Sequence, residues 1–258
     1  MALTDDQLER YARHIILKEV GGVGQARLLA SKVLVIGAGG LGAPVALYLA
    51  AAGVGTIGLI DDDEVALSNL QRQIIYTTGD VGRPKVERAK AHLNALNPDV
   101  TVNIHRMRIT PETADGIISG YDIVADGCDN FATRFAVNDA CYRQGRTLVS
   151  AAVGQFDGQL ATFKPHAGAG LPCYRCFVPA PPPDGAVPNC AEGGIIGALT
   201  GVVGSLQAME VIKEITGVGR SLAGRLMLYD ALDARFRTVT LAADPHCRLC
   251  GTKAAARG

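Results

Sequence analysis

The sequence predicts an α/β protein with a Rossmann-like, mostly parallel sheet covered by helices on both faces. Short apolar runs alternate with helix-like segments over the first 150 residues, which is the pattern of repeated βαβ units. The run Val33–Ile36 leads into Gly37-Ala38-Gly39-Gly40-Leu41-Gly42 and then into an apolar segment of helical length. That is the order of a phosphate-binding strand, turn and helix. A second apolar run ends at Asp61, nineteen positions after Gly42, where a carboxylate can accept hydrogen bonds from ribose hydroxyls.

The alternation predicts each element of this sheet. The expected strands are Val33–Ile36, Thr56–Ile60, Val100–Ile104, Asp122–Ala125 and Thr147–Ser150. The expected helices are Ala43–Ala52, Pro84–Leu96, Pro111–Ser119 and Phe131–Gln144. Proline suits a first helical turn and glycine a helix end. Ligands of such sheets bind beyond the carboxyl ends of the strands, so we expect the glycine turn, Asp61 and Asp126–Asn130 to share one edge.

The two ends of the chain depart from this alternation. Thr4 and Gln7 form a capping-box pattern that predicts a helix from Asp5 to about His14, and Gly21–Gly24 is expected to break the chain. After Ser150 we expect a strand over Gln159–Phe163, an aperiodic stretch over 164–189 rich in Pro, Gly and Cys, and a helix from about Gly194 to Thr216. The runs Arg225–Tyr229 and Phe236–Leu241 predict an antiparallel hairpin.

Composition narrows the class of protein. The chain has 258 residues, 48% hydrophobic and 19% charged, with a formal net charge of zero. These values indicate a globular protein with neither nucleic acid nor a membrane as partner. The acidic start lacks a signal-peptide pattern, so a cytoplasmic location is expected. We predict one domain over 1–258, with a helical segment 5–30, a nucleotide-binding part 31–150 and a carboxyl-terminal part 151–251.

Additional polar groups follow the second expected strand. Two cations, Arg72 and Lys85, lie in or after the polar run Ser68-Asn69-Leu70-Gln71-Arg72-Gln73. A dinucleotide site usually needs only the glycines and the acidic residue, without such cations. Extra fixed positive charge indicates more phosphate to neutralise, and so a nucleoside triphosphate. The alternative is a helix packed closely on the sheet through its glycines, with Asp61 as an ordinary cap.

Four of the seven cysteines form two close pairs, Cys173/Cys176 and Cys247/Cys250, about seventy residues apart. Two CxxC pairs supply the four thiolates of a tetrahedral structural zinc site. A redox pair is disfavoured because neither pair opens a helix after a strand, and disulfides are disfavoured without a secretory signal. Cys141 is expected to be a small buried residue and Cys128 needs no special function. Cys190 precedes a glycine-rich helix, where a thiol can be reactive.

Several ordered motifs together resemble the ThiF/MoeB/HesA family, the bacterial relatives of ubiquitin-activating enzymes. The resemblance runs from about Leu8 to Gly251. The motifs that carry it are Arg10-Tyr11-Ala12-Arg13, the Gly37–Gly42 turn, Ser68–Gln73, Gly82-Arg83-Pro84-Lys85, Asp129-Asn130, both CxxC pairs and Gly204-Ser205-Leu206-Gln207-Ala208-Met209-Glu210.

The resemblance implies an ATP-dependent adenylyltransferase. Its substrate would be a small ubiquitin-like sulfur-carrier protein ending in Gly-Gly, whose carboxylate attacks the α-phosphate of ATP and releases pyrophosphate. By motif match, Gly40 and Asp61 would hold the phosphates and the ribose, and Asp129 would bind Mg²⁺. The full set implied to bind nucleotide is Gly37, Gly39, Gly40, Gly42, Asp61, Ser68, Asn69, Leu70, Gln71, Arg72, Lys85, Asp129 and Asn130.

The resemblance also implies partners. Arg13 matches an arginine that reaches the active site from the other subunit of a homodimer. Cys190 matches a cysteine that takes part in sulfur transfer in ThiF-like members, whereas adenylation alone suffices in MoeB-like members; the neighbouring Asn189 departs from the commoner hydroxyl residue. No rhodanese domain is expected after Gly251, so a separate sulfur donor, a cysteine desulfurase or a rhodanese, is implied.

Simpler interpretations stay open at this point. Arg13 could be a solvated charge, Arg72 and Lys85 surface cations, and Asp129 the cap of the helix beginning near Phe131. A nicotinamide-dependent dehydrogenase is the main functional alternative, although none of the five histidines falls in a catalytic setting. A zinc-stabilised binding protein with an inactive nucleotide site is another. The sequence leaves the pathway open among thiamine, molybdenum cofactor, tRNA thiolation and secondary metabolism.

Overall fold

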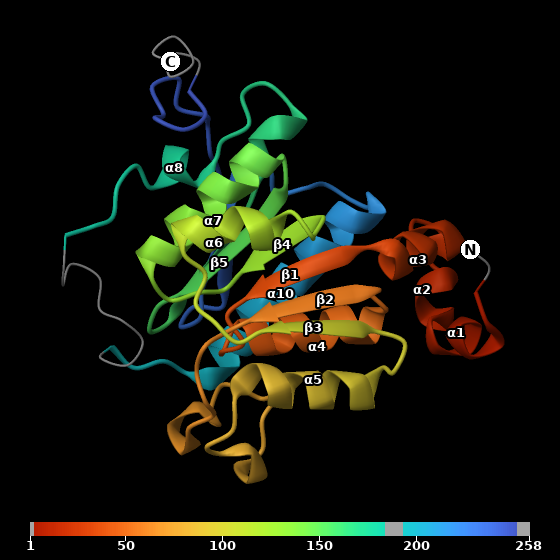
Figure 1. The fold of residues 1–258 in the computed structure, drawn as a ribbon. Helices are drawn as coiled ribbons and strands as arrows, with labels where there is room; N and C mark the ends of the chain where they lie inside the picture. The colour runs from red at the N-terminus through yellow and green to blue at the C-terminus, as the bar shows by residue number, and fades with distance from the viewer. Residues whose placement is uncertain (1–2, 184–192, 252–258) are drawn as a thin grey trace.

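A single eight-stranded sheet organises the protein. The structure is a computed structural model that describes residues 3–183 and 193–251. The strand order is β3-β2-β1-β4-β5-β6-β7-β8, and Figure 1 labels the parallel strands β3, β2, β1, β4 and β5 of this order. The parallel strands are β1 (Lys32–Ile36), β2 (Thr56–Ile60), β3 (Thr101–His105), β4 (Ile123–Asp126) and β5 (Thr147–Val153). The antiparallel extension consists of β6 (Asp157–Phe163), β7 (Arg225–Asp230) and β8 (Arg235–Thr240). All eight predicted strands are confirmed within three residues at either end.

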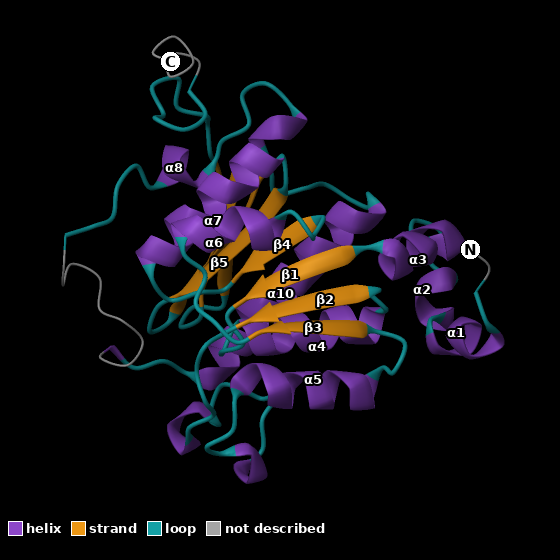
Figure 2. Cartoon of the chain, viewed as in Figure 1, coloured by secondary structure: helices purple, strands orange, loops and turns teal. Residues whose placement is uncertain are grey.

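Helices cover both faces of the sheet (Figure 2). One layer contains α4 (Gly42–Ala52), α5 (Lys85–Leu96) and α10 (Gly197–Thr216), and the other contains α6 (Pro111–Ile118) and α7 (Phe131–Gln144). Successive side chains of a strand point to opposite faces, and β1 follows that rule. Val33 and Val35 join the hydrophobic core under α4, whereas Leu34 and Ile36 join the core under α6 and α7. The predicted fold class is therefore confirmed.

The glycine turn brings α4 very close to the end of β1. Gly37 has a φ of +83°, which favours glycine. A Cβ on Gly42, at the start of α4, would lie 1.8 Å from the carbonyl oxygen of Gly37. A side chain at Gly42 would thus push the helix away from the turn, which opens on the carboxyl edge of the sheet.

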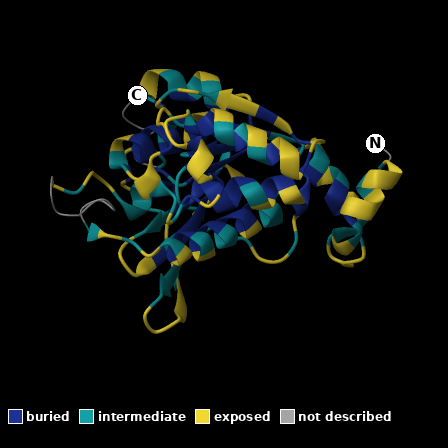
Figure 3. Cartoon of the chain, turned by 90° about the horizontal axis from the view of Figure 1, so that it is seen from below, coloured by how far each residue is buried: buried dark blue, intermediate teal, exposed yellow. Residues whose placement is uncertain are grey.

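The amino-terminal segment corrects one prediction. The helix expected over Asp5–His14 is interrupted at Tyr11, which separates α1 (Asp5–Arg10) from α2 (Ala12–Ile15). Gly21–Gly24 was expected to break the chain, but it forms the first turn of α3 (Gly21–Ala30). Close packing explains the difference, because a Cβ on Gly24 would lie 2.9 Å from Val20 and 3.6 Å from Thr216 of α10. Figure 3 shows how exposed these first helices are compared with the sheet.

The remaining elements are short. The described residues include the 3₁₀ turns η1 (Leu67–Asn69), η2 (Thr78–Asp80) and η3 (Pro165–Ala167), and α8 (Tyr174–Phe177) lies within the stretch expected to be aperiodic. The helix expected from Gly194 begins at Gly197. Within residues 3–183 and 193–251, no helix has the length and apolarity needed to cross a membrane.

A buried carboxylate fixes the segment before α5. The Asp80 side chain is 3% exposed and accepts hydrogen bonds from Thr77, from Arg88 Nε at 2.5 Å and from His92 Nε2 at 2.9 Å. Burial raises its pKa, but the hydrogen bonds from Thr77, His92 and Arg88 outweigh burial and hold that pKa well below the usual range. Asp80 therefore stabilises the fold above the pKa of the unfolded carboxyl, about 4, and this contribution is lost as the pH falls below it.

We expect Asp80→Asn to lower the free energy of unfolding by about 2 kcal/mol at pH 7, because it breaks the ion pair between the buried Asp80 carboxylate and the partly solvated Arg88 guanidinium. The difference from the parent protein should shrink below about pH 4. Urea unfolding at pH 7 and pH 3 measures both values. Asp115→Asn is the control, since it removes an exposed partner of Arg143 and should cost less than about 1 kcal/mol. An equal cost of the two substitutions at pH 7 would contradict this account.

Candidate active site

A cavity of about 580 Å³ opens at the carboxyl ends of the parallel strands. It is bordered by the glycine turn after β1, the acidic end of β2, the segment after β4 and the start of α10. This is the edge at which parallel α/β sheets bind ligands. Nine of the residues predicted to bind nucleotide line it, namely Gly37, Gly39, Gly40, Asp61, Asn69, Arg72, Lys85, Asp129 and Asn130.

Asp61 is anchored to the glycine turn. Its Oδ2 accepts a hydrogen bond from Ala38 N at 2.8 Å, and its Oδ1 accepts one from Asp63 N at 2.9 Å. Tyr76 fixes the same turn, since its hydroxyl donates to Ala38 O at 2.8 Å. Burial raises the pKa of Asp61, an effect that the nearby charge of Lys85 partly offsets. The carboxylate both shapes the turn and borders the cavity.

The two predicted cations are held beside that turn. The Lys85 side chain is 6% exposed and its Nζ lies 2.7 Å from Asp63 Oδ2, whose own side chain is 58% exposed. Arg72 is half-buried and donates from Nη1 to Ser68 O at 3.1 Å. Lys85 is thus buried and lines the cavity, which excludes the interpretation of Lys85 as a surface cation.

Asp129 and Asn130, which follow β4, differ in the hydrogen bonds of their side chains. Asn130 is the N-cap of α7, with its Oδ1 accepting from Thr133 N at 2.9 Å. The simpler interpretation of Asp129 as that cap is therefore wrong. In the described part of the chain the exposed Asp129 carboxylate has one hydrogen bond, a long one of 3.4 Å from Asn130 Nδ2. Its oxygens are free to bind a ligand.

Four residues predicted to bind nucleotide lie outside the cavity lining. Gly42 packs against Gly37, as described above. The carbonyl of Ser68 is bonded to Arg72, and Leu70 packs against the core under α4. Gln71 lies against α10, where a Cβ on Gly197 would be 2.0 Å from Gln71 O. Ser68, Leu70 and Gln71 thus fix the backbone of the segment that carries Asn69 and Arg72.

Arg13 is exposed on α2, which packs on α3 ahead of the start of β1, so it lies at the opposite end of the parallel strands from the cavity (Figure 1). Within one chain the structure does not bring Arg13 to this site. Cys190 lies outside the described residues.

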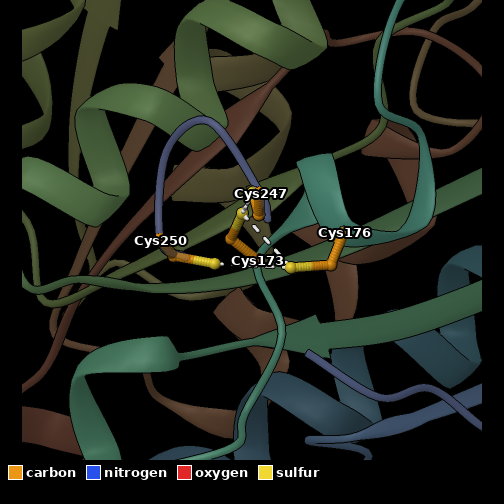
Figure 4. A group of neighbouring side chains, drawn as sticks. All are labelled: Cys173, Cys176, Cys247 and Cys250. Carbon is orange, nitrogen blue, oxygen red and sulfur yellow. Dashed lines mark hydrogen bonds between the residues drawn. The ribbon is translucent and has the colours of Figure 1, made fainter. Parts of the chain in front are cut away.

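The four cysteines of the two pairs meet in one cluster (Figure 4). The Sγ–Sγ distances are 3.6 Å between Cys173 and Cys247, 3.3 Å between Cys176 and Cys250, and 4.0 Å between Cys173 and Cys176. A tetrahedral Zn–S₄ centre with bonds of about 2.3 Å has sulfurs about 3.8 Å apart. The cluster therefore fits zinc. Without a metal, burial and the Cys176 thiol raise the pKa of Cys250 to about 12.

Comparison with known proteins identifies the family. The model of the ThiF family matches residues 11–249. A sulfur carrier protein adenylyltransferase of Thermus thermophilus is 52% identical over 97% of this chain and 93% of its own length. The SAMP-activating enzyme E1 of Haloferax volcanii is 47% identical over 97% of this chain and 92% of its own. The chain belongs to the ThiF family.

Members of this family differ in length. MOCS3 of Bos taurus, an adenylyltransferase and sulfurtransferase, is 49% identical over 98% of this chain but only 55% of its own length. Among solved structures, Escherichia coli MccB with MccA-N7isoASN has a TM-score of 0.84 and 24% identity over 96% of this chain and 76% of its own, which shows a shared fold. These relatives give no support to the dehydrogenase alternative, because the curated ones described here are named as adenylyltransferases or an activating enzyme.

Three cavity residues were missed by the sequence analysis. Asp63 pairs with Lys85, and the acidic run Asp61-Asp62-Asp63 was a signal for it. Gln73 was quoted within a motif but not assigned; it is 4% exposed, and its Oε1 has no partner in the described part of the chain. Arg134 lies within a helix at a spacing that gave no signal, and it is 7% exposed. A buried arginine at a cavity edge is visible only in the folded structure.

Proposed function

We propose that the protein adenylates the carboxyl-terminal Gly-Gly of a ubiquitin-like sulfur-carrier protein with ATP. The observation that carries this proposal is the grouping of Arg72, Lys85 and Asp129 with the glycine turn around one cavity. A nicotinamide dinucleotide does not require such charge, whereas a triphosphate does. The similarity to enzymes named for sulfur-carrier and SAMP activation supports the choice of substrate.

The reaction needs positioning more than proton transfer. The carrier carboxylate is ionised near neutral pH, so one of its oxygens attacks the α-phosphorus and the bond to the bridging oxygen of pyrophosphate breaks. No general base is required. The chain must hold two anions together and stabilise the charge that develops on the leaving group. Lys85 and Arg72 supply that positive charge, and the amino end of α4 directs backbone N–H groups toward the turn.

The donor set fits a magnesium ion beside the phosphates. Asp129 offers a carboxylate whose one hydrogen bond in the described part of the chain is the long contact with Asn130, and hard oxygen donors suit Mg²⁺. Bound with ATP, Mg²⁺ would neutralise phosphate charge. Asp129 would hold it, and Lys85, which lines the same cavity, would add positive charge.

The rest of the assembly follows from the same proposal. Arg13 would complete the site of a second copy in a homodimer, since it lies away from the site of its own chain. Cys173, Cys176, Cys247 and Cys250 would hold a structural zinc with no open position. A separate cysteine desulfurase or rhodanese would deliver sulfur to the adenylated carrier. Cys190 would take part only if transfer proceeds through a covalent link to the carrier.

ATP–pyrophosphate exchange tests this function. With a Gly-Gly-ended carrier, we expect exchange that is lost when the carrier lacks its terminal glycine. Asp129→Ala should reduce exchange by at least about 100-fold, the size of losing one electrostatic contact to the transition state. Calorimetry should show binding of ATP and not of NAD. Absence of exchange with every ubiquitin-like carrier of the source cell would contradict the proposal.

A further inference from the structure

Asp129 owes its position to the backbone rather than to contacts of its own side chain. Its carboxylate has only the 3.4 Å contact with Asn130 in the described part of the chain. The cap of α7 is made by Asn130, not by Asp129. Whatever fixes the backbone between Asp126 and Asn130 therefore decides where the Asp129 oxygens lie.

One buried guanidinium fixes that backbone. Arg134 Nη2 donates to the carbonyl of Cys128, the residue before Asp129, at 2.5 Å, and to Ala151 O at 2.9 Å. Its Nη1 donates to Asp126 Oδ2 at 3.1 Å and to Ser150 Oγ at 3.0 Å. Arg134 thus joins the end of β4, the loop that carries Asp129 and the neighbouring strand β5.

The surroundings of Asp126 complete this network. Asp126 Oδ1 accepts from Cys128 N at 3.0 Å, and Asp126 Oδ2 accepts from Ser150 Oγ at 3.1 Å. Behind it, Gln207 of α10 donates to Asp126 O at 2.9 Å. Three hydrogen bonds therefore fix the loop before Asp129. They involve the N–H of Cys128, the carbonyl of Cys128 and the side chain of Asp126.

The same contacts exclude a direct function for Arg134 in phosphate binding. The guanidinium borders the cavity, but its charge is balanced by Asp126 at 3.1 Å, and both terminal nitrogens are bonded to the protein. A cation that binds phosphate needs free donors. In the described part of the chain the side chains of Lys85 and Arg72 each donate one hydrogen bond, to Asp63 and to Ser68 O, so each keeps further donors. An arginine with a planar fork of donors instead suits a site at which several oxygens must be held in fixed directions.

We propose that Arg134 is a positioning residue that aims the Asp129 carboxylate at the divalent cation of the active site. This inference rests on the proposed function, because it takes Asp129 as the metal-binding carboxylate. Arg134 touches neither nucleotide nor metal. Its effect passes through the Cys128 carbonyl and the Asp126 side chain to the position of Asp129.

Arg134→Lys is the informative variant, because it keeps the charge beside Asp126 but cannot hold the Cys128 and Ala151 carbonyls together with Asp126 and Ser150. Mn²⁺ serves as the probe, with its affinity in the presence of ATP measured by electron paramagnetic resonance. We expect Arg134→Lys to weaken Mn²⁺ at least 10-fold and to raise the half-saturating Mg²⁺ concentration of exchange similarly. Affinity for ATP in EDTA should stay within about twofold of the parent, a split that general destabilisation would not produce.

Two further variants separate the possible outcomes. Asp139→Asn, which breaks the ion pair of Arg175 elsewhere on α7, is the control for a loss of stability and should leave Mn²⁺ affinity unchanged. If Asp129→Ala loses Mn²⁺ while Arg134→Lys retains it, the inference about Arg134 is wrong and the proposed function stands. If Asp129→Ala also retains Mn²⁺, both the metal-binding assignment and this inference fail. Should Arg134→Lys not fold, Ser150→Ala replaces it, with a weakening of Mn²⁺ of about threefold expected and no change contradicting the inference.

Discussion

Lys85→Met should abolish most of the adenylation activity while leaving the fold intact. Among the described cations that line the cavity, the Lys85 side chain is the least exposed, at 6% against 8% for Arg134. Removing one preorganised charge that stabilises a transition state costs about 100- to 1,000-fold in rate, and we expect a loss of that size in ATP–pyrophosphate exchange. Affinity for ATP should fall as well, because the ground-state polyphosphate also meets this charge.

The structure explains why this loss is not a folding defect. The partner of Lys85 is Asp63, whose side chain is 58% exposed, so its carboxylate remains solvated when the ammonium is removed. The free energy of unfolding should change by less than about 1 kcal/mol, the range of exposed ion pairs. Asp63→Asn is the matched control, since it removes the same ion pair but leaves the cation. It should keep at least a tenth of the activity; equal activity loss in the two variants would show that the pair, not the cation, matters.

Loss of the proposed zinc from the cysteine cluster should destabilise the protein more than any single surface change. The cluster joins Cys173 to Cys247 across 74 positions of the chain. In the chain-entropy account, a cross-link of that length is worth about 4 kcal/mol. For a chain of this size, that corresponds to a fall in Tm of about 10 °C. We expect the fall on exhaustive treatment with a strong chelator and equally in Cys250→Ser.

The control for that experiment lies in the same segment. Arg248 is exposed and stands between the two cysteines of the second pair, so Arg248→Ala keeps all four thiols and should keep both the zinc content and the Tm. Atomic emission should find one zinc per chain in the parent and in Arg248→Ala. A metal-free preparation with an unchanged Tm would refute the structural function of the cluster, and one in which zinc restores Tm would support it.

Local pattern was sufficient for the sheet and for the outline of the site. The strands and the long helices follow from apolar periodicity, and their boundaries in the parallel half differ from expectation by at most three residues. Gly37, Asp61 and Lys85 were predicted from turn chemistry and spacing, and all three line one cavity. In a parallel sheet the carboxyl ends of the strands share an edge, so knowledge of the strands already places the residues that follow them.

Tertiary packing overrode local pattern at Gly21–Gly24. Four residues with three glycines predict a break, yet they begin α3, since Gly24 must lie close to Val20 and to Thr216 of α10. The stabilisation comes from a helix nearly two hundred positions later in the chain. Propensity within a short window carries no information about such a contact.

The sequence alone determined the fold class, the glycine turn, the cations and the four cysteines, because each depends on residue type and on short spacing. Only the tertiary structure decided which of those residues face the cavity, that Asn130 rather than Asp129 caps α7, and that Arg134 and Asp126 lie behind the loop. Those outcomes depend on burial and on hydrogen bonds between β4, β5 and α7, and such contacts have no period along the chain. The cysteine cluster belongs to both classes, since spacing predicted the pairs and folding brought them within 4.8 Å of one another.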